Sequence, residues 1–288
     1  MFVAPPDRID FVSAFGFALG YLGGGLLFAL NVLMTLHPSA FGLSGPAQAV
    51  RLSFLTVSVW WIVFSIPIAR FVREGRVAES ALGAASRVKE SLGDLVSTFR
   101  RIRELKMILL FLLAYWLYID GVHTIVRMAV DYGLALGFPS NSLIVAVLIT
   151  QFVGFPAALL FGRIGERAGA RNGIIAGILV YIGVAIWGYR MQSVWEFYVL
   201  AGVIGLVQGG VQSLSRSFYA RLIPAGQSAQ FFGFYNTLGR FAAVLGPLIM
   251  GGVSYATGNP RLSIVAIIPL FIAGGILLLK VKPASNSS

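Results

Sequence analysis

The chain has 288 residues, of which 57% are hydrophobic and only 11% are charged, and its mean hydropathy is +0.84. A soluble domain usually carries about 25% charged residues, so this composition excludes a water-soluble fold and indicates that lipid surrounds most of the chain. The net charge of +11 does not indicate a nucleic-acid-binding protein, because the basic residues lie in gaps between apolar segments. The absence of cysteine excludes a disulfide framework and a cysteine nucleophile.

Eight apolar segments are long enough to cross a membrane as helices, since about 20 residues span the hydrocarbon core. We predict spans at Phe11–Leu36, Leu52–Val72, Met107–Leu136, Leu143–Phe161, Gly173–Tyr189, Phe197–Phe218, Phe231–Tyr255 and Leu262–Leu279. None shows the period of two that is typical of a membrane β-barrel strand. The expected fold class is therefore all-α, a polytopic membrane protein with about eight transmembrane helices.

The distribution of lysine and arginine predicts the orientation of these spans. With the N-terminus in the cytoplasm, 17 of the 22 basic residues fall on the cytoplasmic side. Arg51, Arg190 and Arg261 fall on the opposite side, and Arg127 and Arg240 fall within predicted spans. This asymmetry predicts that both termini are cytoplasmic.

The segment from residue 74 to residue 106 differs from the rest, because it is rich in charge. Its apolar residues recur at helical spacing: Val88, Leu92, Leu95, Phe99 and Ile102. One interpretation is an amphipathic helix that lies on the membrane or on the protein. The other is a solvated connector between two halves of the chain.

Two predicted spans begin in the same way. The sequences "AFGFALG" at residues 14–20 and "FFGFYNTLG" at residues 231–239 each follow a proline and a short polar turn. If they are equivalent positions of an internal repeat, each repeat has six helices, as in transporters with two six-helix halves. We then expect 1–73 to hold the last two helices of the N-terminal half, 74–106 the cytoplasmic linker and 107–288 a complete C-terminal half. By this count the first half lacks its first four helices.

The sequence "GRIGERAGAR" between the fourth and fifth spans resembles the signature loop of the major facilitator superfamily. Gly162, Glu166, Arg167, Gly169 and Arg171 match its positions, with glutamate in place of the usual aspartate. We expect a gating loop, because glycines permit a tight turn and the acid can hold the cytoplasmic face closed. The alternative is a basic loop that only sets the topology.

The stretches "PPDRIDFVSAFGFALGYLGGG" and "RLIPAGQSAQFFGFYNTLGRFAAVLGP" narrow the resemblance. They resemble the "unknown major facilitator" family, the bacterial branch related to fungal vacuolar effluxers linked to autophagy, and this resemblance covers essentially the whole chain. It implies an N-terminally truncated secondary transporter in the bacterial inner (plasma) membrane. The export of amino acids by the fungal relatives implies amino acids as a solute class.

Ionisable residues within the third span need a reason, because an ionised group costs roughly 2.5–3.5 kcal/mol at the centre of a membrane helix. Asp120, His123, Arg127 and Asp131 share one helical face. The resemblance implies that this helix lines the transport pathway. We expect Asp120 to bind a proton or cation, His123 to relay it and Arg127 to contact an anionic group of the solute. The alternative is a structural ladder in which Arg127 pairs with His123 or Asp131.

Polar residues also mark the sixth and seventh spans. Gln208, Gln212 and Arg216 recur at every fourth position, and the two glutamines can bind solute or bridge helices. Arg216 is expected to reach the cytoplasmic surface. Asn236 and Arg240 lie in the seventh span, where Arg240 is deep enough to require a buried acidic partner. The glycines and proline that follow in "LGPLIMGG" indicate close helix packing.

Other classes of protein are less consistent with these residues. An intramembrane aspartyl protease needs a second acid in a Gly-x-Gly-Asp sequence, which is absent, so we expect no enzyme. Asp120 and His123 lack a third ligand for a metal site, and no cofactor is expected. The expected partners are the bilayer, a small solute, protons and, if separately encoded, the missing helices. A fragment or remnant that does not transport stays open as an alternative.

Overall fold

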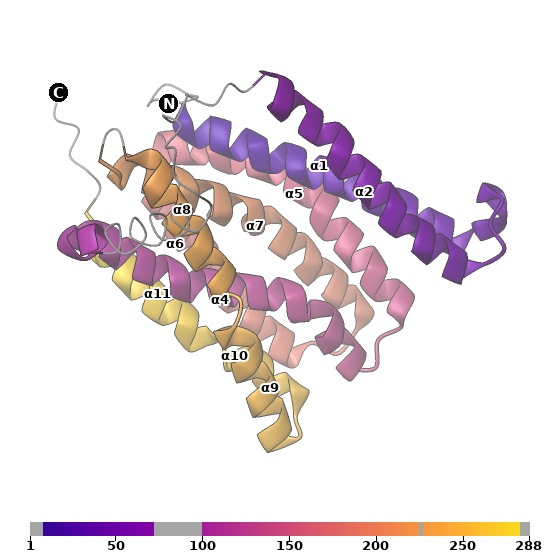
Figure 1. The fold of residues 1–288 in the computed structure, drawn as a ribbon. Helices are drawn as coiled ribbons and strands as arrows, with labels where there is room; N and C mark the ends of the chain where they lie inside the picture. The colour runs from indigo at the N-terminus through magenta and orange to yellow at the C-terminus, as the bar shows by residue number, and fades with distance from the viewer. Residues whose placement is uncertain (1–7, 72–99, 225–226, 283–288) are drawn as a thin grey trace, which may run out of the picture. The chain divides into compact units, whose positions relative to one another are not determined.

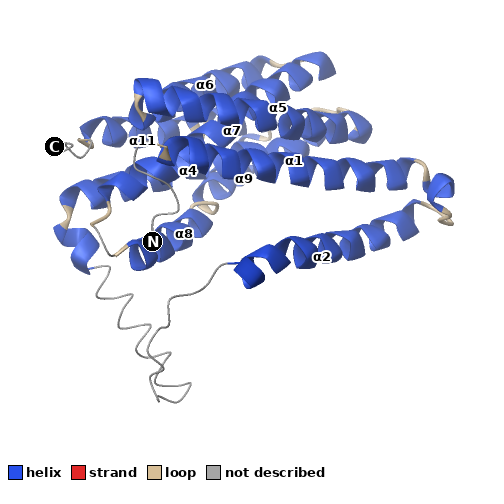
Figure 2. Cartoon of the chain, turned by 90° about the horizontal axis from the view of Figure 1, so that it is seen from above, coloured by secondary structure: helices blue, strands red, loops and turns tan. Residues whose placement is uncertain are grey.

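A computed structural model of the chain describes residues 8–71, 100–224 and 227–282. Regular structure in these ranges is helical, and eight segments are long and apolar enough to cross a membrane (Figure 2). The helices are α1 (Ile9–Leu36), η1 (Pro38–Phe41), α2 (Pro46–Phe71), α4 (Lys106–Ala135), α5 (Ser140–Ala168), α6 (Ala170–Arg190), α7 (Val194–Leu222), α8 (Ser228–Phe241), α9 (Leu245–Thr257), α10 (Pro260–Val265) and α11 (Ile268–Lys280). The predicted all-α membrane fold is confirmed.

The chain divides into two compact units, one of residues 1–22 with 93–288 and the other of residues 23–92. The smaller unit contains the second part of α1 and the helix α2. Within it the Thr56 hydroxyl donates to the Asn31 side chain over 2.9 Å. The helix predicted at 74–106 lies largely outside the described residues, although Ile102 in its described part is fully buried.

The larger unit is built around α4, which packs against α7, α8, α9 and α11 (Figure 1). Helices α5 and α7 run along each other at its other side. Helices in lipid associate through close packing, since no hydrophobic force drives them together. Glycine makes the closest approaches possible because it has no side chain. A Cβ at Gly274 of α11 would lie 2.9 Å from the backbone nitrogen of Tyr118 in α4. These helices therefore meet backbone to backbone.

The seventh and eighth spans, predicted at 231–255 and 262–279, are present, and each is built from two helices. The seventh consists of α8 and α9, and the eighth of α10 and α11. Proline explains both breaks, because it has no N–H for the carbonyl four residues earlier. Pro247 and Pro269 lie in the first turns of α9 and α11.

Candidate functional site

A cleft of about 780 Å³ opens in the larger unit between the start of α1 and the helices α5, α7 and α8. Its polar lining includes Ser13, Tyr21, Gln151, Gln212 and Arg216. A cleft of this size accommodates a small organic solute, since ligand pockets usually measure about 300–1,000 Å³.

Arg216 is the cation of this cleft. It is exposed, and its guanidinium carbon lies 5.7 Å from the centroid of the Phe232 ring. A cation held over an aromatic face keeps its N–H groups available at its edge. The side chain thus lines the cleft. Gln212, one turn earlier on α7, lines the same space.

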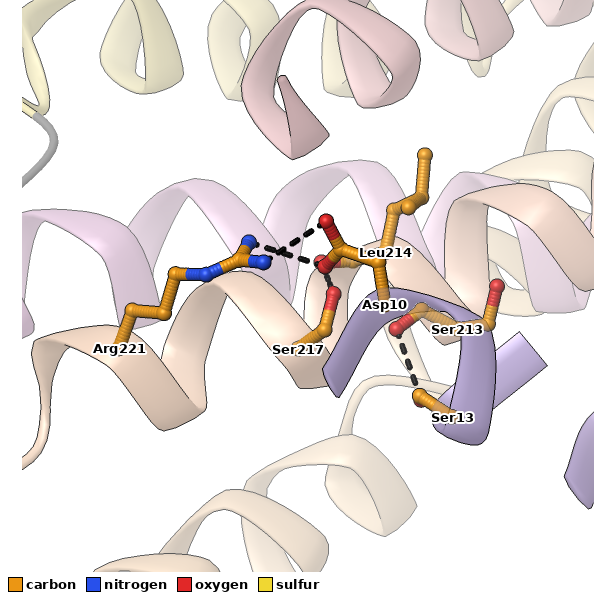
Figure 3. Close-up of polar contacts among 6 residues, drawn as sticks. All are labelled: Asp10, Ser13, Ser213, Leu214, Ser217 and Arg221. Carbon is orange, nitrogen blue, oxygen red and sulfur yellow. Dashed lines mark hydrogen bonds and ion pairs between the residues drawn. The ribbon is translucent and has the colours of Figure 1, made fainter. Parts of the chain in front are cut away.

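An ion pair lies beside the cleft and joins α1 to α7. Both guanidinium nitrogens of Arg221 donate to the Asp10 carboxylate, over 2.9 and 2.8 Å (Figure 3). Asp10 is fully buried, whereas the Arg221 side chain is 36% exposed. A second bond, from the Ser13 hydroxyl to the carbonyl of Ser213 over 3.0 Å, joins the same two helices (Figure 3). A bidentate pair of this kind fixes both distance and orientation.

The signature motif packs against this ion pair mainly through its glycines. A Cβ at Gly162 would lie 2.7 Å from that of Ala14, and one at Gly165 would lie 3.2 Å from the Asp10 carboxylate. Residues 162–168 form the last turns of α5, so most of the motif is helical. Only Gly169 turns the chain, with φ +85°. Most of the motif's glycines serve helix contact and not a turn.

The charged residues of the motif lie at the same end of the unit. Glu166 and Arg167 are exposed, and Glu166 forms no hydrogen bond or ion pair with another described side chain. Arg171, at the start of α6, donates to the carbonyl of Leu279 near the end of α11 over 2.8 Å. The acid that contacts a motif glycine and pairs with an arginine is Asp10, from outside the motif.

Asp120 is fully buried and receives hydrogen bonds at both carboxylate oxygens. The backbone N–H groups of Leu245 and Gly246 donate to it over 3.1 and 2.9 Å. The Thr124 hydroxyl donates more weakly, over 3.3 Å. Asp120 therefore holds the first turn of α9, where the seventh span is broken.

The other predicted site residues of α4 are not joined in a ladder. Arg127 and Asp131 are exposed, and Arg127 forms an ion pair with neither His123 nor Asp131 in the described structure. His123 is half-buried, and its Nδ1 lies buried without a hydrogen-bond partner. Asp120 is thus buried, whereas Arg127 and Asp131, the charged residues further along the same face, are exposed.

The remaining predicted residues fall in three places. Gln208 lines an apolar cavity of about 120 Å³ among α4, α5, α6 and α7, and its Oε1 is buried without a partner. Gln212, one turn later, lines the large cleft, while Gln151 lines both spaces. Asn236 and Arg240 are exposed on α8. Among the described residues, no three His, Asp or Glu side chains gather closely enough to hold a metal ion.

Comparison with known proteins identifies the family. The family model described as "Vacuole effluxer Atg22 like" matches residues 6–286. The chain belongs to this family. It is 35% identical over 287 residues to the "Uncharacterized MFS-type transporter YxiO" of Bacillus subtilis, a match that covers 99% of this chain and 66% of that protein. The resemblance to vacuolar effluxers of the major facilitator superfamily, expected from the sequence, is confirmed.

Two fungal proteins also match this Atg22-like chain. It is 28% identical to "Autophagy-related protein 22-1" of Penicillium rubens over 90% of this chain and 48% of that protein. It is 30% identical to "Autophagy-related protein 22-2" of Aspergillus clavatus over 87% of this chain and 44% of that protein. The chain thus spans about half the length of these fungal relatives. The names of the family and of the Bacillus relative describe effluxers and transporters, which agrees with the expectation that the protein is not an enzyme.

Sequence analysis of this Atg22-like protein missed Asp10 and Arg221 as a functional pair. The two residues are 211 positions apart, and Arg221 was counted only as a topological charge. One signal was available, because an acid in the first turn of an apolar helix needs a partner when that turn is buried.

Proposed function

We propose that this Atg22-like chain works as a secondary active transporter of the major facilitator type, which exposes a solute site alternately to the two sides of the membrane. In this proposal its spans correspond to the last eight of twelve helices, with residues 107–288 as one six-helix half, 1–73 as the end of the other and 74–106 as the linker. Membership of the Atg22-like family and the MFS-type relative support it.

The solute site of this proposal is the cleft beside α7. The observation that carries it is Arg216, an exposed arginine that is held over Phe232 and has no carboxylate partner among the described residues. Its N–H groups suit a carboxylate, and Gln151 and Gln212 offer amide donors and acceptors on the same walls. Small solutes with a carboxylate, amino acids first, are the class that this lining fits.

The gate of this proposal is the ion pair between Asp10 and Arg221. It joins α1 to α7 beside the cleft, and Ser13 and Ser217 next to it line the cleft itself. Gly162, Gly165 and the other motif residues Glu166, Arg167, Gly169 and Arg171 surround the same end of the unit. Alternating access requires contacts that can separate, and an ion pair with one partly exposed partner can exchange its bonds for water.

Proton coupling is assigned to Asp120. Two acids are fully buried in the described structure, and Asp10 is balanced by Arg221, whereas Asp120 has no cationic partner. Neutralisation by a proton is the usual response of such a carboxyl group in a membrane. His123, one turn along, is proposed to relay the proton, and Arg127, Asp131, Gln208, Asn236 and Arg240 are retained as candidate pathway residues.

The orientation that we propose places both termini in the cytoplasm, in a bacterial inner (plasma) membrane. The support is the count of 17 of 22 basic residues on one side of the predicted topology. The start of α1 and the ends of α5, α7 and α11 lie at this side in that topology, together with the gate.

Uptake by lipid vesicles that contain the purified chain tests the proposal, with a panel of radiolabelled amino acids and with or without a pH gradient. We expect uptake that a pH gradient stimulates and that Arg216→Gln reduces by about tenfold or more, since charged hydrogen bonds are worth about 1.5–3 kcal/mol. Arg190→Gln, at the end of α6, removes an exposed arginine outside the cleft and should leave uptake unchanged. Equal uptake by Arg216→Gln and the parent chain would exclude Arg216 as the anion site. Absence of uptake for every amino acid would favour the non-transporting alternative.

A further inference from the structure

The two helices of the seventh span are attached to the larger unit by different chemistry. Helix α8 is attached through aromatic rings, because Tyr235 stacks on Tyr115 and Tyr219 with centroid distances of 4.3 and 4.9 Å. The Tyr219 hydroxyl adds a bond of 3.1 Å to the carbonyl of Phe231. Helix α9 is attached to α4 by the hydrogen bonds that Asp120 accepts. Helix α9 also packs against α10. Loss of the Asp120 bonds would therefore release the first turn of α9 from α4 while α8 stayed in place.

The break creates donors that need an acceptor. The first N–H groups of a helix have no partner within it, and an unpaired N–H is costly in hydrocarbon. The Asp120 carboxylate supplies an acceptor for Leu245 and Gly246, one at each oxygen. Pro247, the next residue, has no N–H to satisfy. The first two residues of α9 thus have acceptors for their N–H groups, and the third residue has no N–H.

The approach of α9 to Asp120 depends on a glycine. A Cβ at Gly246 would overlap the Thr124 hydroxyl and lie 2.9 Å from Oδ1 of Asp120. Thr124 is itself fully buried and donates to that same oxygen. The contact between α4 and the first turn of α9 is therefore specific to glycine at this position.

No side-chain charge compensates Asp120. The titratable or charged groups on its own helix and on the helices packed against it are Lys106, Tyr115, Tyr118, His123, Arg127, Asp131 and Tyr132 on α4, Arg163, Glu166 and Arg167 on α5, Glu196, Tyr198, Arg216, Tyr219 and Arg221 on α7, Tyr235 and Arg240 on α8, Tyr255 on α9, Arg261 on α10 and Lys280 on α11. Among these described groups, none forms an ion pair or hydrogen bond with its carboxylate. The N–H groups and the dipole of α9 stabilise its negative charge.

We propose that Asp120 is a positioning residue whose charge holds the first turn of α9 on α4, so that residues 242–244 act as a hinge controlled by protonation. The ionised carboxylate accepts two backbone N–H bonds. The protonated group keeps one oxygen with reduced acceptor strength and turns the other into a donor, which has no acceptor on α9. Proton binding thereby releases α9 from α4. The link to transport rests on the proposed function, whereas the hinge itself is measured without transport.

Hydrogen–deuterium exchange of the full chain in lipid nanodiscs tests this inference, because the amides of Leu245 and Gly246 report on the bonds themselves. We expect Asp120→Asn to speed exchange in a peptide covering these amides by about tenfold, with little change in peptides of α8. Glu104→Gln removes an exposed acid just before α4 and should have no effect. Gly246→Ala should reproduce the faster exchange, whereas Gly252→Ala should not, because a Cβ there meets nothing within 4 Å.

The pH dependence of this amide exchange distinguishes control by the charge of Asp120 from a structural role that does not depend on its charge. After correction for intrinsic exchange, acid should remove the protection of Leu245 and Gly246 in the parent chain, and Asp120→Asn should abolish this pH dependence. Unchanged exchange in both Asp120→Asn and Gly246→Ala, or protection of the parent chain that is independent of pH, would overturn the inference. If the profile appears but the vesicles take up no amino acid, the hinge stands and the proposed function fails. If uptake occurs without the profile, the hinge fails alone.

Discussion

Asp10 and Asp120 are the two fully buried acids of the larger unit, and their negative charges are stabilised in different ways. Asp10 is neutralised by a cation that reaches it from a partly exposed position, and Asp120 by the N–H groups of a broken helix. The first solution joins two intact helices near one end of the unit, and the second holds half of a span at a break. An ion pair therefore suits a gate that opens to water, and a backbone clamp suits a hinge inside the membrane.

The largest expected effect comes from breaking the ion pair. Arg221→Ala leaves Asp10 buried without a cation and should lower the free energy of unfolding by about 3 kcal/mol. Titration with sodium dodecyl sulfate in mixed micelles measures this change. Arg221→Lys keeps the charge but not the bidentate geometry. Its free energy of unfolding should lie between those of the parent chain and Arg221→Ala. A loss below about 1 kcal/mol for Arg221→Ala would show that water already compensates Asp10.

A smaller effect is expected from the glycine that contacts Asp10. Gly165→Ala places a Cβ against Leu214 and 3.2 Å from the Asp10 carboxylate, and should cost about 1–3 kcal/mol in the same assay. Gly183→Ala on α6 is the matched control, because its Cβ meets nothing within 4 Å. It should be neutral or stabilise the protein by up to about 1 kcal/mol, since alanine favours helix. Equal effects of the two substitutions would contradict the assigned contact.

The smallest expected effect is a difference between Asp10 and Asp120 in how salt changes their contribution to the free energy of unfolding. Raising the ionic strength shortens the Debye length to about 3 Å at 1 M and weakens pairs that solvent reaches. The unfolding difference between the parent chain and Arg221→Ala should shrink by about 0.5 kcal/mol in high salt, because Arg221 is partly exposed. The difference between the parent chain and Asp120→Asn should stay constant. A matching salt response at both acids would remove the distinction between gate and hinge.

Sequence analysis predicted the eight spans and the family, because apolar length and short motifs are local properties. It also selected Asp120 as exceptional, since an acid in an apolar helix needs a partner. It did not predict that partner, because the N–H groups of Leu245 and Gly246 become available only after the helix breaks, 125 residues later. Pro247 was a readable signal for that break.

The signature motif shows a second limit of sequence reasoning. Glycine serves a turn at Gly169 and close helix contact at Gly162 and Gly165, and the letter alone does not distinguish these uses. The contact of Arg216 with the cleft was equally unreadable from the sequence, because a long side chain near a helix end can extend in several directions. Its direction follows from Phe232, which only the folded arrangement of α7 and α8 provides.

The break in the seventh span also constrains how the protein is assembled during synthesis. Helices of 14 and 13 residues are each about 20 Å long, too short to cross the hydrocarbon core of about 30 Å alone. The two halves must therefore leave the translocation machinery as one segment. The hydrogen bonds from Leu245 and Gly246 to Asp120, which hold α9 but not α8, can form only after this segment has been inserted. By then the synthesis of α4, which carries Asp120, is already complete.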